Sequence, residues 1–189
     1  MFNVGDKIVY PMHGAGEITS IEEKEILGEK QSYYILKMPG EVKVMVPTDK
    51  VENIGVRNII EEQDTTKVFK ILENDRTDMS MNWNKRYRDN YEKIKTGDIY
   101  EVADVVRNLS FKQKEKGLST GEKKMLNNAK QILVSELVLA GQSDKDQVEN
   151  MVDAKILTSF EQAQVGEIQD TPATNIVKKF IPLDGTGNM

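Results

Sequence analysis

The stretch VGDKIVYPMHGAGEITSIEEKEILGEKQSYYILKMPGEVKVMVP, residues 4–47, consists of short segments rich in Val, Ile and Tyr. Turn-forming residues separate the segments, at Pro11 to Gly16, at Gly28 and at Pro39–Gly40. β-Branched and aromatic residues favour strands, so each segment is predicted to be one. Because all of them fit within a short part of the chain, we expect a small, strongly bent sheet closed into an SH3-like or Tudor-like barrel.

The pattern becomes helical after Arg57. Apolar residues then recur at the spacing that buries one face of a helix, as in Val102, Val105, Val106 and Leu109. Capping residues mark the helix starts, and Gly97 and Gly117 mark two of the ends. The predicted starts are Asp64 or Thr65, Asn82, Asp98, Ser119, and Ser143 or Asp144. The second half is therefore predicted to be a compact helical bundle.

The expected fold class is thus a two-domain chain, β then α. The predicted divisions are a β domain at 1–57, a linker at 58–65, a helical domain at 66–157 and a polar tail at 158–189. The tail is rich in Gly and Pro, and we expect at most a short helix near residues 160–165. Its one apolar cluster is IVKKFIPL.

Composition excludes several classes of protein. The chain has 189 residues and no cysteine, which rules out disulfide scaffolds, zinc–thiolate sites and thiol nucleophiles. No apolar stretch is long enough to cross a bilayer, and the start does not resemble a signal peptide, so we expect a soluble cytoplasmic protein.

The residues do not favour an enzyme. The single histidine, His13, lies in a tight turn with no base or orienting partner in view. Gly14 and Gly16 precede a strand, whereas glycine-rich phosphate loops open a helix. The adjacent pairs Glu22–Glu23 and Glu61–Glu62 point apart on a strand or helix, so they do not predict a metal site. We therefore expect no catalysis, no cofactor and no metal.

The charge of the chain is unevenly distributed. Its net charge is −5, yet residues 83–130 carry 12 basic and 7 acidic side chains. The flanking segments 59–82 and 131–157 each have a net charge of −3. A local zone of +5 within an acidic chain predicts weak binding to free duplex DNA with little sequence preference.

The single tryptophan, Trp83, opens this basic zone in the stretch MNWNKRYRDNY. Trp83, Tyr87, Tyr91 and Ile94 share one helical stripe, and that spacing alone makes all four core residues. Trp83, however, is at the very start of the predicted helix and follows a polar, loop-like stretch. The sequence is compatible with both a buried and an exposed Trp83 ring. An exposed ring flanked by cations is typical of side chains that wedge between base steps.

Long segments of the chain resemble a known family. Residues from VGDKIVY to SYYILKM, followed by VMVP, are similar to the RNA polymerase-interacting domain shared by CarD and CdnL transcription regulators and the transcription-repair coupling factor. NWNKRYRDNYEKIKTGDIYEVADVVRNL and KGLSTGEKKMLNNAKQILVSELVLA resemble the helical domain particular to CarD and CdnL. The resemblance covers about residues 1–157 and leaves the tail outside.

The resemblance implies a specific mechanism. The β domain would bind the beta subunit of bacterial RNA polymerase, and Trp83 would wedge into the minor groove at the upstream edge of the promoter bubble. Basic DNA-contacting positions map onto Lys85, Arg86, Arg88 and Lys123, and Lys124 extends the same basic surface. Polymerase-facing positions fall on Lys24, Ile26 and Met45, with Lys43 as a further contact. Relatives often have an arginine where this chain has Met45, which implies either a more apolar interface or one that depends on Lys24 and Lys43. The protein is expected to be a monomer located at the nucleoid through polymerase.

An alternative is a sequence-specific helix-turn-helix repressor that acts without polymerase. The helices joined by residues 116–119 would then place Lys123, Lys124, Asn127 and Lys130 in a major groove. Thr120, Gly121 and Glu122 argue against it, because they occupy the helix start where base-reading side chains are needed.

Overall fold

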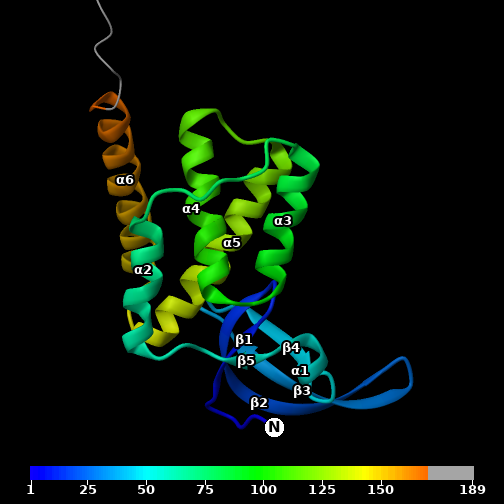
Figure 1. The fold of residues 1–189 in the computed structure, drawn as a ribbon. Helices are drawn as coiled ribbons and strands as arrows, with labels where there is room; N and C mark the ends of the chain where they lie inside the picture. Colours follow the sequence, from blue (N-terminus) through cyan, green and yellow to red (C-terminus); the bar gives the residue numbers. More distant parts are fainter. Residues whose placement is uncertain (170–189) are drawn as a thin grey trace, which may run out of the picture.

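The structure is a computed structural model of the chain, and it describes residues 1–169. A sheet occupies one end of the molecule and helices stand on it (Figure 1). The predicted order, β then α, is confirmed. No helix in the described part of the chain combines the length and the apolar character needed to span a membrane.

The sheet has five antiparallel strands in the order β4-β3-β2-β1-β5. Their bounds are β1 Lys7–Tyr10, β2 Gly14–Ile26, β3 Glu29–Lys37, β4 Lys43–Pro47 and β5 Arg57–Asn58. The distal halves of β2 and β3 pair only with each other and project from the sheet as a hairpin (Figure 1). Ile8, Ile18, Tyr34, Leu36, Val46 and Val51 form the core of this domain.

The expected barrel does not close. β4 and β5 lie at opposite edges of the sheet and do not pair with each other. The segment between them forms a short helix, α1 Val51–Ile54, and β5 is only 2 residues long. Too little strand therefore remains to join the two edges, and the sheet is open.

The helical part follows the predicted starts closely. After a 3₁₀ turn, η1 Glu62–Asp64, come α2 Thr65–Glu73, α3 Trp83–Lys95, α4 Ile99–Glu115, α5 Thr120–Gly141 and α6 Lys145–Gln169. Asn82, Asp98 and Ser119 each cap the helix that follows, and only Ser119 forms a full capping box, with Glu122. Val102, Val105, Val106 and Leu109 are all fully buried in the bundle core, as their spacing predicts.

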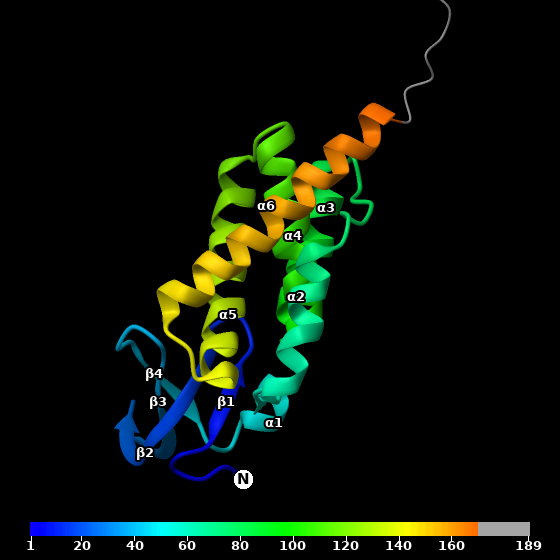
Figure 2. The ribbon, with the colours of Figure 1, turned by 90° about the vertical axis from the view of Figure 1, so that its left-hand side faces the viewer.

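The last helix differs from the expectation. α6 crosses the bundle and packs against α2, α4 and α5 (Figure 2). It continues without a break to Gln169, so residues 158–169 are helical and the expected short helix near 160–165 is part of α6. Phe160 stacks edge-on against Phe111, with 5.3 Å between ring centroids, and this contact carries the helix past the predicted boundary. The IVKKFIPL cluster lies outside the described residues.

Candidate nucleic-acid interface

Trp83 is the first residue of α3, at the end of the bundle farthest from the sheet (Figure 1). Asn82 caps the helix: its side-chain oxygen accepts a hydrogen bond from the Lys85 backbone N–H at 3.0 Å. The Trp83 side chain is 46% exposed. Of the two positions that the sequence left open for this ring, the structure has the exposed one.

The exposed ring is nevertheless held in one orientation. Its Nε1–H donates to the Ser119 hydroxyl oxygen at 3.1 Å. Its face stacks on Tyr87, with 5.4 Å between centroids and 30° between planes. A Cβ placed at Gly121 would lie 3.8 Å from Trp83 Cζ2 and 3.4 Å from Tyr87 Cε2, so the α5 backbone directly supports both rings. An orientation fixed before binding lowers the entropy cost of binding.

A buried carboxylate, Glu122, organises the residues beneath the ring. The Ser119 hydroxyl donates to Glu122 Oε2 at 2.9 Å while it accepts from the Trp83 indole. Arg86 Nε donates to Glu122 Oε1 at 2.8 Å, and Lys112 Nζ donates to Oε2 at 3.2 Å. Burial raises the pKa of Glu122, but the bonds from Arg86, Ser119 and Lys112 outweigh it and lower the pKa to about 2. Glu122 is therefore ionised at neutral pH.

Arg86 does not occupy the position expected of a DNA contact. Its side chain is buried, and besides Glu122 its guanidinium donates to the carbonyl oxygens of Ser80 and Met81. Burying an arginine is favourable only when its charge and donors are satisfied, as they are here. Arg86 thus fixes the segment that leads into Trp83, and its charge does not face solvent.

The buried stripe of α3 also differs from the predicted one. Arg86, Asn90 and Ile94 form it, whereas Trp83 and Tyr91 are exposed, Tyr91 by 40%. The helix is rotated so that its aromatic stripe lies at the margin of the interface with α4 and α5. This rotation follows from the Arg86–Glu122 pair, which sequence periodicity cannot detect because it counts only apolar residues.

The remaining predicted cations are available at the surface. Lys85 and Arg88 on α3 and Lys123 and Lys124 in the first turns of α5 are all exposed. The hydrogen bond between Trp83 and Ser119 places these two helix starts side by side. The structure therefore places an exposed indole at the start of α3 beside the start of α5, and both helices carry exposed cations in their first turns, which are suitable for binding a phosphate backbone.

Two other lysines form ion pairs within the chain. Lys112 is drawn to Glu122, and Lys130 forms an ion pair with Asp153 at 2.5 Å. Lys130 belongs to the set that a helix-turn-helix reader would place in the major groove. Its partner on α6 reduces the positive charge that this reading requires.

The segment before α3 is fixed from a second side. The Thr77 backbone N–H donates to Asn108 Oδ1 at 3.0 Å, and Arg107 donates to the Ile71 carbonyl at 2.8 Å. Arg107 also forms an ion pair with Asp104. Burial raises the pKa of Asp104, but the hydrogen bond from Lys93 and the charge of Arg107 prevail and lower it. The polar segment before α3 is therefore held at both ends, by Asn108 at Thr77 and by Arg86 at Ser80 and Met81.

The predicted polymerase-facing residues share one face of the sheet. Met45 lies opposite Ile35, and Ile35 opposite Ser20, so their side chains point the same way. Side chains two residues apart on a strand share a face, which adds Lys43 on β4, and Lys24 and Ile26 on β2. All four predicted residues therefore share one face, but the register does not cluster them. Lys43 and Met45 lie across β3 from Glu17 and Ser20, whereas Lys24 and Ile26 lie near the tip of the β2–β3 hairpin, opposite Gln31 and Glu29.

This face is partly charged and partly apolar. Met45 is 47% exposed, and Ile26 is similarly exposed. Lys24 Nζ lies 3.0 Å from Glu22 Oε2, and this hydrogen bond is the main cause of the lowered pKa of Glu22, to which Ser20 and the charge of Lys43 also contribute. β4 is an edge strand of the sheet, so one side of its backbone is unpaired within the described residues.

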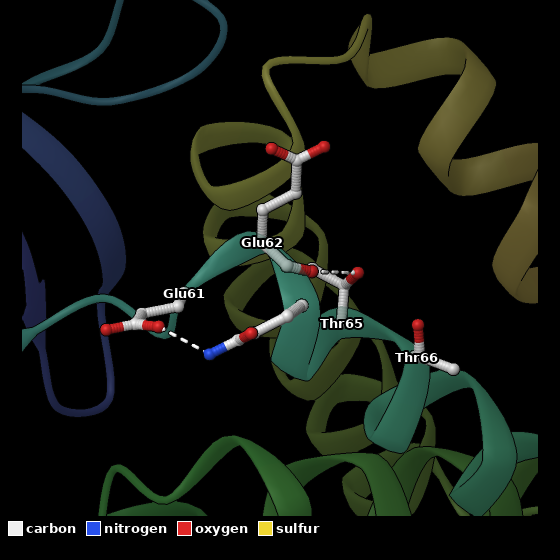
Figure 3. Close-up of a pocket in the computed structure, with 5 residues that line it drawn as sticks. Glu61, Glu62, Thr65 and Thr66 are labelled. Atoms are coloured by element: carbon white, nitrogen blue, oxygen red, sulfur yellow. Dashed lines mark hydrogen bonds between the residues drawn. The ribbon is translucent and has the colours of Figure 1, made fainter.

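The acidic pairs do not form a metal site. Glu61 and Glu62 border a shallow hollow with Gln63, Thr65 and Thr66, but their carboxylates point in different directions (Figure 3). Glu61 accepts a hydrogen bond from Gln63 at 2.7 Å instead. Within residues 1–169 no group of three or more potential ligands is arranged to hold a metal ion.

Comparisons with known proteins agree with both parts of this structure. Residues 2–60 match the model of the CarD-like/TRCF RID domain. Residues 67–153 match the model of the CarD C-terminal domain. The chain belongs to the CarD family. The two matches lie on either side of residues 61–66, so the family's two domains correspond to the sheet and the bundle.

A curated relative of this CarD-family chain covers the same region. It is the Bacillus subtilis (strain 168) protein described as "Putative transcription factor YdeB". The two are 46% identical over 147 residues, which is 77% of this chain and 96% of the relative. The family identifies the chain as a transcription regulator, as the sequence resemblance implied.

Sequence reasoning missed several residues that shape the interface. Ser119 was expected as the residue at a helix start, but nothing in the sequence showed that its hydroxyl also binds the Trp83 indole. Glu136 carried a usable signal, since an acidic residue in the apolar run ILVSELVLA indicates a buried, paired charge. The partner of such a charge cannot be identified without the fold.

Proposed function

We propose that this protein binds the beta subunit of RNA polymerase through its sheet and stabilises the promoter open complex with Trp83 at the upstream edge of the bubble. Lys85, Arg88, Lys123 and Lys124 would bind the flanking phosphates. Arg86 is assigned a positioning role in place of the DNA contact expected of it. The proposal describes a regulator whose partners are polymerase and promoter DNA.

The orientation of Trp83 is the observation that carries this proposal. The indole is 46% exposed at a helix start and is held in one orientation by Ser119 and Tyr87, so it can meet a ligand without first being ordered. Apolar side chains that enter the minor groove unstack a base step at a cost of a few kcal/mol, which contacts with the deformed duplex recover. A rigid ring flanked by cations meets both requirements.

The charge of the chain explains why an anchor is needed. With a net charge of −5 and four exposed cations near Trp83, free duplex DNA should bind weakly and with a modest salt dependence. Attachment to polymerase raises the local concentration of the interface at the promoter. A stabilisation of about 1.4 kcal/mol is then enough to change the opening equilibrium tenfold.

The sheet offers a suitable anchor. Its exposed face carries Ile26 and Met45 beside Lys24 and Lys43, and β4 has an unpaired backbone edge. A partner strand that adds to this edge would receive most of its affinity from backbone hydrogen bonds. The apolar side chains would then fill pockets on the partner.

The test is the lifetime of the open complex on a promoter whose opening limits transcription. Trp83→Ala should abolish most of the lengthening of that lifetime, about tenfold, without affecting binding to polymerase. Tyr91→Ala is the matched control, since it removes a similarly exposed aromatic from the same helix. Equal lifetimes for Trp83→Ala and the unmodified protein would rule out the wedge.

The anchor is tested in a separate assay, which measures binding to the polymerase beta subunit. Met45→Glu should weaken binding to a purified beta-subunit fragment, because a charge would be placed against an apolar part of the partner. Met151→Glu is the control, as Met151 is similarly exposed but belongs to α6 and not to the sheet. Tight binding of one DNA sequence without polymerase would instead favour the helix-turn-helix repressor.

A further inference from the structure

One helix, α5, contacts both parts of the proposed mechanism. Its first turn carries Ser119 and Glu122, which hold Trp83. Its last turns carry Ser135 and Glu136, which bind the sheet domain. Glu122 and Glu136 are 14 residues apart, which corresponds to about 21 Å along a helix.

Ser135 binds the start of β2. Its hydroxyl accepts a hydrogen bond from the Ala15 backbone N–H at 2.8 Å and donates to the Ile132 carbonyl at 2.7 Å. At Gly14 the strand has φ +107, and a Cβ there would lie 2.5 Å from Ser135 Oγ. Only glycine permits this close approach of strand to helix. Lys7 Nζ adds a bond to the Leu139 carbonyl at 3.1 Å.

Glu136 binds the segment that joins the two domains. It is 1% exposed and accepts from Arg57 Nη1 at 2.7 Å, from Nη2 at 2.9 Å and from the Ile60 backbone N–H at 3.0 Å. Arg57 is on β5, and its Nε and Nη2 also donate to the Gly97 carbonyl, at 3.0 and 2.5 Å. The fork geometry of a guanidinium fixes direction as well as distance. Arg57 thus ties the sheet to α5 and to the end of α3.

We infer that Arg57 and Glu136 are positioning residues that fix the direction in which Trp83 points relative to the polymerase-facing side of the sheet. The inference rests on the proposed function. The two domains would then act as one rigid body, with α5 as the element that connects the anchor to the ring. Neither residue touches DNA or polymerase in this scheme.

The size of the effect follows from the length of α3. The helix ends beside the Arg57 junction at Gly97, and its 13 residues place Trp83 about 20 Å away. A tilt of the bundle by about 10° about the junction would move the ring by about 3.5 Å. Successive bases on one strand are about 3.4 Å apart, so such a tilt would misplace the ring by one base step. A loosely jointed bundle would reach DNA but seldom the correct step.

The test compares two double variants of the full chain. Arg57→Gln with Glu136→Gln removes the junction charges together and leaves neither one buried alone, so the fold should survive. Lys130→Gln with Asp153→Asn is the matched control, because it removes an ion pair between α5 and α6 that does not join the domains. Arg57→Lys is a second variant that keeps the charge but lacks the fork.

Domain orientation is measured in the free protein. The chain has no cysteine, so Glu52→Cys on α1 and Asp89→Cys on α3, both exposed, give unique sites for spin labels. We expect a narrow interspin distance distribution for the parent and the control, and a broad one for the junction variant and for Arg57→Lys. A narrow, unchanged distribution in both junction variants would overturn the inference, whatever the outcome with polymerase.

Function is measured with the same variants before labelling. The affinity of the junction variant for the beta-subunit fragment should be within about twofold of that of the parent. The increase in open-complex lifetime that it produces should be at least about fivefold smaller than the increase produced by the parent. Arg57→Lys should lie between the two, and the control should match the parent. Full open-complex lifetimes with a broadened distance distribution would overturn the inference while leaving the proposed function intact. A failed Trp83→Ala test would reject the proposed function, and the distance measurement would still report on the junction.

Discussion

Each end of α5 carries a glutamate that pairs with an arginine, but one pair lies beneath an exposed side chain and the other joins two domains. At its start, the Arg86–Glu122 pair is buried beneath a tryptophan that faces solvent. Near its end, the Glu136 carboxylate is buried between the two domains, and its partner Arg57 is 31% exposed. In both places a glutamate from α5 satisfies an arginine that also binds backbone carbonyls.

The difference shows that the exposure of Trp83 is not a sign of loose packing. The residues beneath the ring are as fully hydrogen-bonded as those at the domain junction, and no buried side-chain polar atom in the described residues lacks a partner. An exposed ring supported by well-ordered protein residues is typical of a preorganised binding group. Substitutions and acid can show whether the two ends are as similar in energy as they are in geometry.

The largest effect is expected from removing one partner of the pair at the start of α5. Arg86→Ala leaves the Glu122 carboxylate buried with only Lys112 as a charged partner, and should lower the free energy of unfolding by about 3 to 5 kcal/mol. Urea denaturation measures this value. Lys85→Ala, on the exposed side of the same turn, should change it by less than about 0.5 kcal/mol. Equal effects of the two substitutions would mean that Arg86 has no structural role.

The next largest effect is expected from acid at the start of α5. The folded pKa of Glu122 is about 2 against a usual value of 4.5, so the ionised form stabilises the fold above pH 4.5. That stabilisation, about 3 kcal/mol, should be lost progressively as the pH falls from 4.5 toward 2. Urea titrations at a series of pH values measure the slope. Glu122→Gln should be less stable at neutral pH and show a smaller slope. An equal slope in that variant would assign the acid sensitivity to other groups.

The smallest effect on stability is expected from replacing Ser119, whose hydroxyl accepts the hydrogen bond from the Trp83 indole. Ser119→Ala removes the N-cap of α5 and the acceptor of the Trp83 indole, and should cost about 1 kcal/mol. Ser119→Thr retains the hydroxyl and should cost less. Trp83 fluorescence anisotropy provides a separate measure, since the ring should move more freely in the alanine variant alone. Unchanged anisotropy would show that stacking on Tyr87 is sufficient to orient the ring.

Much of the fold could be predicted because its signals are local. Strand composition, turn residues and helix caps act within a few residues, and they placed the starts of α3, α4 and α5 correctly. Closure of the sheet and the length of α6 depend on distant partners. The first requires β4 and β5 to meet, and the second depends on Phe160 reaching Phe111. Neither contact is encoded in a local pattern.

The candidate site divides in the same way. Lys85, Arg88, Lys123 and Lys124 were expected at the surface and lie there. Arg86 is different, because whether a cation is exposed or paired depends on a carboxylate 36 residues away. The apolar periodicity of α3 was misleading for the same reason, since part of its buried face is polar. A paired charge in a core appears in the sequence as an ordinary surface residue.

The unpaired edge of β4 affects how the proposed binding of a partner strand can vary when side chains are exchanged. A strand that joins an edge is recognised chiefly through its amides and carbonyls, which every residue except proline supplies alike. Side chains on that strand can then be exchanged without abolishing the docking geometry. A methionine at position 45 in place of a charged residue would therefore adjust the strength of attachment while the direction of approach stays the same.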